Sequence, residues 1–143
     1  MIDLSTLLLT AFYALFGILL MIVSNTIMDF FVPGDFAAEI KRGNCAVAWL
    51  SAGSFIGIGQ ILRAVILSPA YGAVPPDFLQ GVLLSIVYAA VGIVFFVLGF
   101  FIIKMWHRKY ALAEQIMRGN TAAGIFLFGV FVGLSLVISG AVH

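Results

Sequence analysis

The sequence has few charged residues, a single cysteine and little histidine. Only 9% of its 143 residues are Asp, Glu, Lys or Arg, whereas 64% are hydrophobic and the mean hydropathy is +1.22. Soluble domains are about 25% charged, so a water-soluble globular protein is excluded. One cysteine excludes a disulfide framework and a cysteine-rich metal site. A net charge of +1 excludes a protein that binds nucleic acid by bulk electrostatics.

Long uncharged runs separate the few charges. No charged residue lies in 4–28, 78–103 or 119–143, and Arg63 alone interrupts 43–68. A helix needs about 20 apolar residues to cross the hydrocarbon core of a bilayer. The runs lack the two-residue alternation of a membrane β-barrel. We therefore predict an all-α membrane protein with transmembrane helices over 4–28, 45–68, 79–103 and 121–141.

The basic residues predict the orientation of these helices. The connection 29–44 carries two of the seven Lys and Arg residues, and the connection 104–120 carries four. The N-terminus and the loop 69–78 carry none. The positive-inside rule places the basic connections in the cytoplasm, and both termini and the 69–78 loop outside it. The first helix has no basic leader, so we expect it to be retained rather than removed as a signal peptide.

The second half of the sequence repeats the first. The Arg-Gly-Asn tripeptide at 42–44 recurs at 118–120, and Tyr-Ala at 13–14 recurs at 88–89. Each copy holds two predicted spans and therefore returns the chain to its starting side. We predict two tandem helical hairpins of the same orientation, related by a pseudo-two-fold axis along the membrane normal. Repeat 1 covers 1–68 and repeat 2 covers 79–143, joined by the loop 69–78.

Small residues line one side of each predicted span. At 100° per residue they fall within a narrow arc of the helix. Lipid supplies no hydrophobic force between helices, so close backbone approach over small residues is what drives their association. We therefore predict that each repeat is a tightly packed hairpin. The glycines expected at the packing faces are Gly17, Gly53, Gly57, Gly92, Gly129 and Gly133.

The Arg-Gly-Asn motif stands directly before the second span of each repeat. Asparagine is a preferred helix N-cap, and glycine permits backbone angles that larger residues avoid. The segments leading into the motif have mixed character, and we predict interfacial helices over 35–42 and 106–118. An anion or lipid-headgroup site is the alternative to a structural role. The residues of this motif are Arg42, Gly43 and Asn44 with Arg118, Gly119 and Asn120.

The doubled motif also points to a known family. Glu-Ile-Lys-Arg-Gly-Asn-Cys-Ala at 39–46 and Glu-Gln-Ile-Met-Arg-Gly-Asn-Thr-Ala at 114–122 each enter a glycine-rich helix. This pattern resembles the bacterial inner-membrane family called domain of unknown function 350. Its members are small and have four predicted membrane helices in two copies of one unit. The resemblance spans essentially the whole chain and implies an inner-membrane location. The family has no agreed activity, so the resemblance implies no catalytic residue.

Two polar features lie in or beside the spans. Arg63 is the charge inside a span, and Gln60 lies about one turn from it. Either Arg63 snorkels outward, with Asp77 as a candidate partner, or Gln60 and Arg63 form an intramembrane polar site. Asp29 and Lys104 occupy equivalent positions with opposite charge. They are a candidate charge pair, within one chain or between neighbours.

The sequence offers few groups for catalysis. His107 and His143 have no acidic cluster nearby, and Cys45 has no histidine close in sequence. We predict no catalytic residue, no cofactor and no metal. The leading prediction is a non-enzymatic inner-membrane protein that contacts membrane lipids and associates with itself or serves as an accessory subunit of a larger membrane complex. The alternative is an oligomeric channel for ions or small solutes, with polar groups from Thr6, Thr10, Ser24, Gln60, Arg63 and Ser85.

Overall fold

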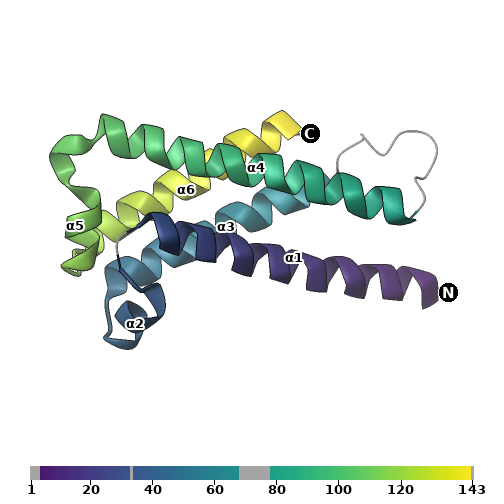
Figure 1. Cartoon of the computed structure of the whole chain (residues 1–143), viewed down its shortest axis with the longest axis horizontal. Coiled ribbons are helices and arrows are strands. Elements are labelled where there is room, and N and C mark those ends of the chain that lie inside the picture. The colour runs from purple at the N-terminus through teal and green to yellow at the C-terminus, as the bar shows by residue number, and fades with distance from the viewer. Residues whose placement is uncertain (1–3, 33, 68–77, 143) are drawn as a thin grey trace.

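The computed structural model describes residues 4–32, 34–67 and 78–142, apart from the side chains of 5, 6, 78, 79, 81, 84, 85 and 142. Over these residues the chain is helical, with no strand. The four long helices run along the molecule, and the two short α-helices lie at the same end of it (Figure 1). The elements are α1 (Leu4–Phe31), α2 (Phe36–Lys41), α3 (Cys45–Leu67), α4 (Phe78–Trp106), the 3-10 helix η2 (Arg108–Tyr110), α5 (Leu112–Met117) and α6 (Thr121–Val142).

The long helices confirm the predicted all-α membrane architecture. α1 and α4 both run toward the end that carries α2 and α5, so the two hairpins have the same orientation (Figure 1). Both helices continue three residues past their predicted ends, to Phe31 and Trp106. The predicted loop 69–78 lies outside the described residues, apart from Phe78, which begins α4. The spans long and apolar enough to cross a bilayer are Leu7–Phe31, Cys45–Leu67, Ile86–Trp106 and Thr121–Ala141.

The two short connecting segments differ in their backbone. In the first, Asp35 is the N-cap of α2, and its carboxylate accepts a hydrogen bond from the Ala38 amide at 3.0 Å. The second was expected to be one helix over 106–118, but it breaks into η2 and α5 at Ala111, whose φ is +42°. Ala111 stands at the position of Asp35 and offers no side-chain acceptor. The helix therefore restarts without a cap.

α3 is the central helix. It contacts α1, α4 and α6, and 56% of its apolar span is buried, against 6% for the span of α1. It is also the least apolar of the four spans, as expected for a helix that meets protein more than lipid. Its buried Leu50 and Ile58 share the core with Phe96 of α4 and Phe131 of α6. The rings of Phe96 and Phe131 lie 4.9 Å apart, centroid to centroid.

The two hairpins do not meet through equivalent faces, which corrects the predicted two-fold relation. A two-fold axis brings the same face of each unit together. Here the small residues of α3 are buried in the contact between the hairpins, whereas their equivalents in α6 are exposed. They are Ala46, Gly53 and Gly57 in α3, and Ala122, Gly129 and Gly133 in α6. The two repeats therefore meet through different faces while pointing the same way, which is a heterologous (head-to-tail) contact.

Candidate functional site: the charged end and the open helix face

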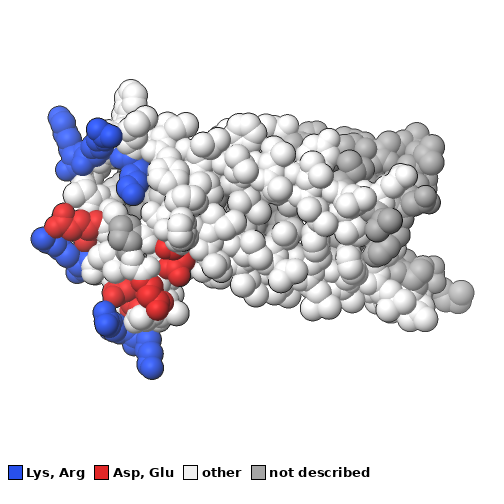
Figure 2. Space-filling view, in the orientation of Figure 1, with Lys and Arg blue, Asp and Glu red and all other residues white. Residues whose placement is uncertain are grey.

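Charged side chains gather at the end of the molecule that carries α2 and α5, which we call the charged end (Figure 2). Two ion pairs are present among the described residues: Arg42 with Glu39 at 3.0 Å, and Arg118 with Glu114. Both arginine side chains are mostly exposed. Exposed ion pairs contribute about 0–1 kcal/mol, so these pairs orient the side chains more than they stabilise the fold.

The Gly-Asn part of the repeated motif forms a corner between a short helix and the next long one. Gly43 has a φ of +85° and Gly119 a φ of +79°, values that favour glycine. The amides of Gly43 and Asn44 each donate to carbonyls of α2 at 3.0 Å, which are the two bonds of a Schellman helix end. The same pair of bonds recurs at Gly119 and Asn120. The motif thus ends one helix and begins the next within two residues.

Each asparagine of the motif also ties the two helices of its corner together. Asn44 Oδ1 accepts from two amides in the first turn of α3, at 3.0 and 3.3 Å, while its Nδ2 donates to Glu39 Oε2 at 3.0 Å. Asn120 Oδ1 accepts from the Ala122 amide at 3.1 Å, and its Nδ2 donates to Gln115 Oε1 at 3.0 Å. Glu39 therefore binds both Arg42 and Asn44. In repeat 2, Glu114 binds Arg118 and Gln115 binds Asn120.

One further bond distinguishes the two asparagines. Asn44 Nδ2 also donates to the carbonyl of Ile116 at 3.0 Å, which links repeat 1 to repeat 2. Asn120 makes no such bond to the other hairpin within the described part of the chain. Ile116 is fully buried, whereas its counterpart Ile40 is 45% exposed. The motif of repeat 1 therefore joins the hairpins, and the motif of repeat 2 lies at an open edge.

The predicted charge pair between Asp29 and Lys104 is not formed within the chain. Asp29 Oδ1 accepts a hydrogen bond from the Phe36 amide at 3.0 Å, so this carboxylate is used at the start of α2. Lys104 Nζ instead lies 6.0 and 5.9 Å from the ring centroids of Phe100 and Phe101. The two equivalent positions thus have different local roles, and this corrects the intrachain pairing.

Gln60 and Arg63 line a cavity of about 180 Å³ between α3 and α6, together with Ser139. The cavity lies toward the C-terminal ends of both helices, away from the charged end. Arg63 is exposed and forms no ion pair with a described carboxylate. Two residues of the predicted polar path, Thr6 and Ser85, have side chains outside the described part of the structure. Asp77, the candidate partner of Arg63, also lies outside the described residues.

Three buried polar atoms in α1 and α3 were not predicted from the sequence. Asn25 Oδ1, Ser51 Oγ and Ser54 Oγ are buried with no hydrogen-bond partner among the described residues. Two other buried serines, Ser24 and Ser135, donate to carbonyls of their own helices at 2.8 and 2.7 Å. A single small polar residue in an apolar span is common, so the sequence carries no signal that singles these three out.

The six glycines predicted at packing faces divide into two groups. A Cβ on Gly57 would lie 2.8 Å from the ring of Phe96, and a Cβ on Gly92 would lie 2.5 Å from Ile61 Cγ2. A Cβ on Gly53 would lie 2.8 Å from the backbone of α6. In the second group the Cβ position has no neighbouring element within 4 Å among the described residues. This group is Gly17, Gly129 and Gly133.

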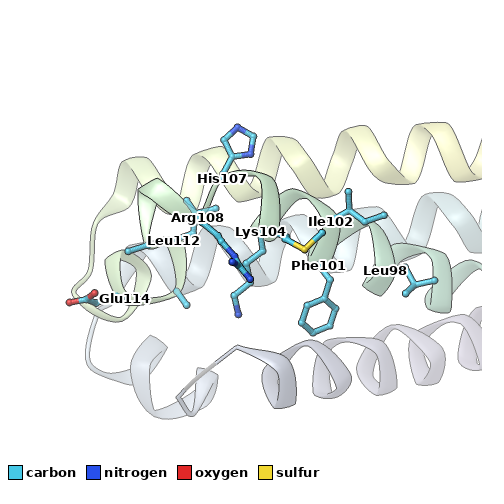
Figure 3. A pocket seen from close by; sticks show the side chains of 11 residues that line it. Leu98, Phe101, Ile102, Lys104, His107, Arg108, Leu112 and Glu114 are labelled. Atoms are coloured by element: carbon cyan, nitrogen blue, oxygen red, sulfur yellow. The ribbon is translucent and has the colours of Figure 1, made fainter.

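A larger cavity, of about 560 Å³, opens beside the last turns of α4 and the start of α5. Phe101 and Ile102 contribute to its largely apolar wall. Lys104 and Arg108 extend to the same side of α4, while His107 points away (Figure 3). Neither cation forms an ion pair with a described carboxylate. The cavity combines an apolar wall with two cations, an arrangement that suits an amphiphile with an anionic head.

Four apolar helices in two copies of one hairpin define a membrane protein with an internal repeat. The family described as Domain of Unknown Function (DUF350) matches residues 1–75 and again 77–143, and the chain belongs to this family. This confirms both the resemblance seen in the sequence and the duplication.

Two curated relatives are transmembrane proteins. The UPF0719 transmembrane protein YshE of Bacillus subtilis (strain 168) is 23% identical over 134 residues, which cover 94% of this chain and 92% of the relative. A UPF0719 transmembrane protein of Aquifex aeolicus (strain VF5) is 21% identical over 125 residues, 87% of this chain but 46% of the relative. No solved structure matches. These relatives support an integral membrane protein, and their names state no activity.

Proposed function

We propose that this protein is a non-enzymatic protein of the bacterial inner membrane that acts by associating with other membrane protein, either further copies of itself or a larger partner. One observation carries the proposal: α6 exposes a face, which we call the small face, whose counterpart in α3 is the buried packing face. Its residues are Ala122, Phe126, Gly129, Gly133, Val137 and Gly140, equivalent to the buried Ala46, Leu50, Gly53, Gly57, Ile61 and Ala64.

The small face suits a helix better than it suits lipid. Glycines at 129 and 133 leave a notch that another helix backbone can enter, and such close approach drives helix association in membranes. On α3 the equivalent notch is filled by the ring of Phe96 and the backbone of α6. Val137, at the position of the buried Ile61, is 73% exposed. The exposed copy of a packing face supports association as the role of α6.

The local roles of the polar residues support a non-enzymatic function. The two asparagines of the repeated motif cap helices, and Glu39 and Glu114 pair with arginines. Buried Ser24 and Ser135 bond to carbonyls of their own helices. Each of these groups has a structural task in the fold, which supports a structural role for it rather than a catalytic one.

The distribution of basic residues supports an orientation. Six of the seven Lys and Arg residues lie in or beside α2, the last turn of α4, η2 and α5, which form the charged end: Lys41, Arg42, Lys104, Arg108, Lys109 and Arg118. By the positive-inside rule this end faces the cytoplasm, and both termini lie on the opposite side of the membrane.

Native mass spectrometry of the protein, extracted from its own membrane in lipid nanodiscs without overexpression, tests the proposal. A mass at a multiple of 15.4 kDa supports self-association, and a heteromeric mass supports an accessory subunit. A mass of one chain alone, at physiological expression, overturns both forms of the proposal.

A channel is the second candidate, and the cavity beside Arg63 favours it. Gln60, Arg63 and Ser139 offer hydrogen-bond donors and acceptors around a cavity between α3 and α6. Intramembrane ionisable residues often mark ion pathways. Ion flux from the pure protein in liposomes, lost in Arg63→Leu, supports this candidate. Equal flux from wild-type and Arg63→Leu protein, or none from either, overturns it.

A further inference from the structure

The contact between the two hairpins brings together different sides of equivalent helices. α3 uses its own small face, which is formed by Ala46, Leu50, Gly53, Gly57, Ile61 and Ala64. α6 uses its opposite side, which we call the far face: Gly124, Phe128, Phe131 and Ser135 in α6, equivalent to Ala48, Ala52, Phe55 and Gly59 in α3. Gly124 and Phe131 are buried, whereas Ala48 is exposed and Phe55 is partly exposed. The chain therefore leaves most of the small face of α6 open, apart from Phe126, which contacts the rings of His107 and Tyr110. The far face of α3 is open at Ala48 and partly covered at Ala52, Phe55 and Gly59.

The flanking helices repeat this asymmetry. In the formed contact, Phe96 of α4 covers Gly57, and Ile61 covers Gly92. The equivalent pairs are Met21 with Gly133, and Val137 with Gly17. Neither glycine of these second pairs has a neighbouring element within 4 Å in the described residues. The chain thus forms one interface of this kind internally. The two surfaces equivalent to its sides, at Gly17 and at Gly133, have no partner within the described residues.

The charged end carries the same pattern in a hydrogen bond. Asn44 donates to the carbonyl of Ile116 across the formed contact. The equivalent donor is Asn120 and the equivalent acceptor is the carbonyl of Ile40. Asn120 is exposed and the Ile40 side chain is 45% exposed. Helix faces, flanking glycines and this polar pair therefore identify the same two open surfaces.

We propose that the small face of α6 in one copy docks on the far face of α3 and on α1 of a second copy, by the same head-to-tail contact that joins the two repeats within a chain. This inference rests on the proposed function, because it names the partner and the surface used for association. The occupant is a second copy, since the complementary surface is present on the chain itself and continues its internal interface. A head-to-tail contact leaves one open face at each end of a pair, so association continues beyond two copies.

The contact between copies is slightly wider than the contact within a chain. Ala48 carries a methyl group where Gly124 has none, and a Cβ at Gly124 would lie 2.5 Å from the carbonyl oxygen of Ala46. The flexible Met21 takes the place of the Phe96 ring and can follow a changed gap. A separation that admits the Ala48 methyl brings the Cβ atoms of Ala48 and Ala122 to about the 3.5–4.5 Å of a disulfide.

Cysteine cross-linking in native membranes tests the contact. Cys45→Thr, which introduces the residue found at the equivalent position 121, removes the native thiol. In this background, Ala48→Cys and Ala122→Cys are placed in separate, differently tagged copies that are expressed together. Mild oxidation is expected to give a mixed dimer, and a chain carrying both cysteines is expected to give a ladder of trimers and larger species. Ile125→Cys in place of Ala122→Cys is the matched control, because Ile125 lies on the same turn, is 49% exposed and belongs to neither face.

Two outcomes overturn this inference alone. A dimer of Ala122→Cys chains alone indicates a two-fold contact between small faces. Absence of the mixed dimer, in a protein whose native mass shows several identical copies, indicates self-association through another surface. In both cases the proposed self-association survives. A protein that is a single chain by native mass, and that gives no cross-link, overturns the proposed function together with this inference.

The cavity at the charged end carries a second, independent inference. Its wall is largely apolar, and Lys104 in the last turn of α4 and Arg108 at the start of η2 extend on the same side (Figure 3). The arginines of the repeated motif are paired with glutamates, whereas these two cations lack a described carboxylate partner. Glu114 also lines the cavity, but it pairs with Arg118. Lys104 lies near the end of the Ile86–Trp106 span, and the ends of such a span are expected to meet the lipid headgroups.

We infer that this cavity binds an anionic phospholipid, with the phosphate between Lys104 and Arg108 and an acyl chain along Phe101 and Ile102. Cationic side chains at the membrane surface attract such headgroups. The apolar wall adds affinity that inorganic phosphate lacks.

Native mass spectrometry of delipidated protein with added phosphatidylglycerol, phosphatidylcholine or inorganic phosphate tests the site. Lys104→Gln/Arg108→Gln is expected to weaken phosphatidylglycerol binding on the order of tenfold or more. The control Lys41→Gln/Arg42→Gln removes the same charge from α2 and its C-cap and is expected to leave binding unchanged. Equal loss in both double variants, equal binding of phosphatidylcholine, or equal competition by inorganic phosphate overturns the assignment.

Discussion

At the scale of single residues, the glycines at 57 and 133 are equivalent in sequence and opposite in environment. A leucine at 57 must displace Phe96 and press on the carbonyl of Phe131, 3.3 Å from the Cβ position. Overpacking of this kind costs about 1–3 kcal/mol. We predict that Gly57→Leu lowers the thermal unfolding midpoint in detergent, whereas Gly133→Leu leaves the midpoint of the monomer unchanged and reduces assembly in native mass spectra. Equal midpoints for the two variants would contradict this.

The asparagines of the motif provide the second residue-scale prediction. Loss of an N-cap costs about 0.5–2 kcal/mol, and this applies to Asn44→Ala and Asn120→Ala alike. Asn44→Ala also removes the bond to the Ile116 carbonyl, worth about 0.5–1.5 kcal/mol. We predict the lower unfolding midpoint for Asn44→Ala, measured under the same conditions. A larger loss in Asn120→Ala would show that Ile116 contributes nothing through this bond.

The glycines at 57 and 133 and the asparagines at 44 and 120 show which local roles can be predicted from sequence. The cap and the glycine corner were predictable, because both depend on residues within five positions of each other. The bond from Asn44 to Ile116 was not, because 72 positions separate the two residues. The small faces of α3 and α6 have the same periodicity, so the pattern assigns both to packing. Which copy is buried is decided by how the hairpins dock, and no local pattern encodes this.

At the scale of elements, the four spans were predictable from their length and lack of charge, but their arrangement was not. Each span is apolar over most of its surface, so hydrophobic periodicity gives no direction for the core. The small-residue sides predict a packing face on each helix but do not say which helix covers it. The central position of α3 depends on contacts with the three other long helices. The break at Ala111 was missed for a different reason. An alanine gives no signal for a left-handed backbone, which glycine and asparagine usually provide.

The same break gives a prediction at the scale of elements. A residue with a side chain costs roughly 1–2 kcal/mol in the left-handed region, and the extra freedom of glycine in the unfolded chain offsets about 0.5–1 kcal/mol of the relief. We predict that Ala111→Gly raises the unfolding midpoint by a small amount. Ala113→Gly, inside α5, is the matched control and lowers it by the usual cost of glycine in a helix. Equal losses in both variants would show that the break at Ala111 carries no strain.

At the scale of the whole molecule, charge divides the protein into a charged end and a long apolar body (Figure 2). The same division determines how the repeats can associate in a membrane. Both hairpins place their charged corners at one end, so a head-to-tail array keeps every charged end on one side of the bilayer. An inverted pair would carry half of the arginines to the other side, against the positive-inside rule.

The native cysteine tests this orientation directly. Cys45 is exposed at the start of α3, beside the charged corner. We predict that a membrane-impermeant maleimide labels Cys45 only after the cells are permeabilised, because the charged end faces the cytoplasm. In a Cys45→Thr background, Ala141→Cys near the far end of α6 is expected to react in intact cells. Labelling of Cys45 in intact cells, with Ala141→Cys protected, would reverse the topology and place all six basic residues of the charged end outside. That outcome would require the charged end to bind anionic groups on the outer surface rather than those of the cytoplasmic leaflet.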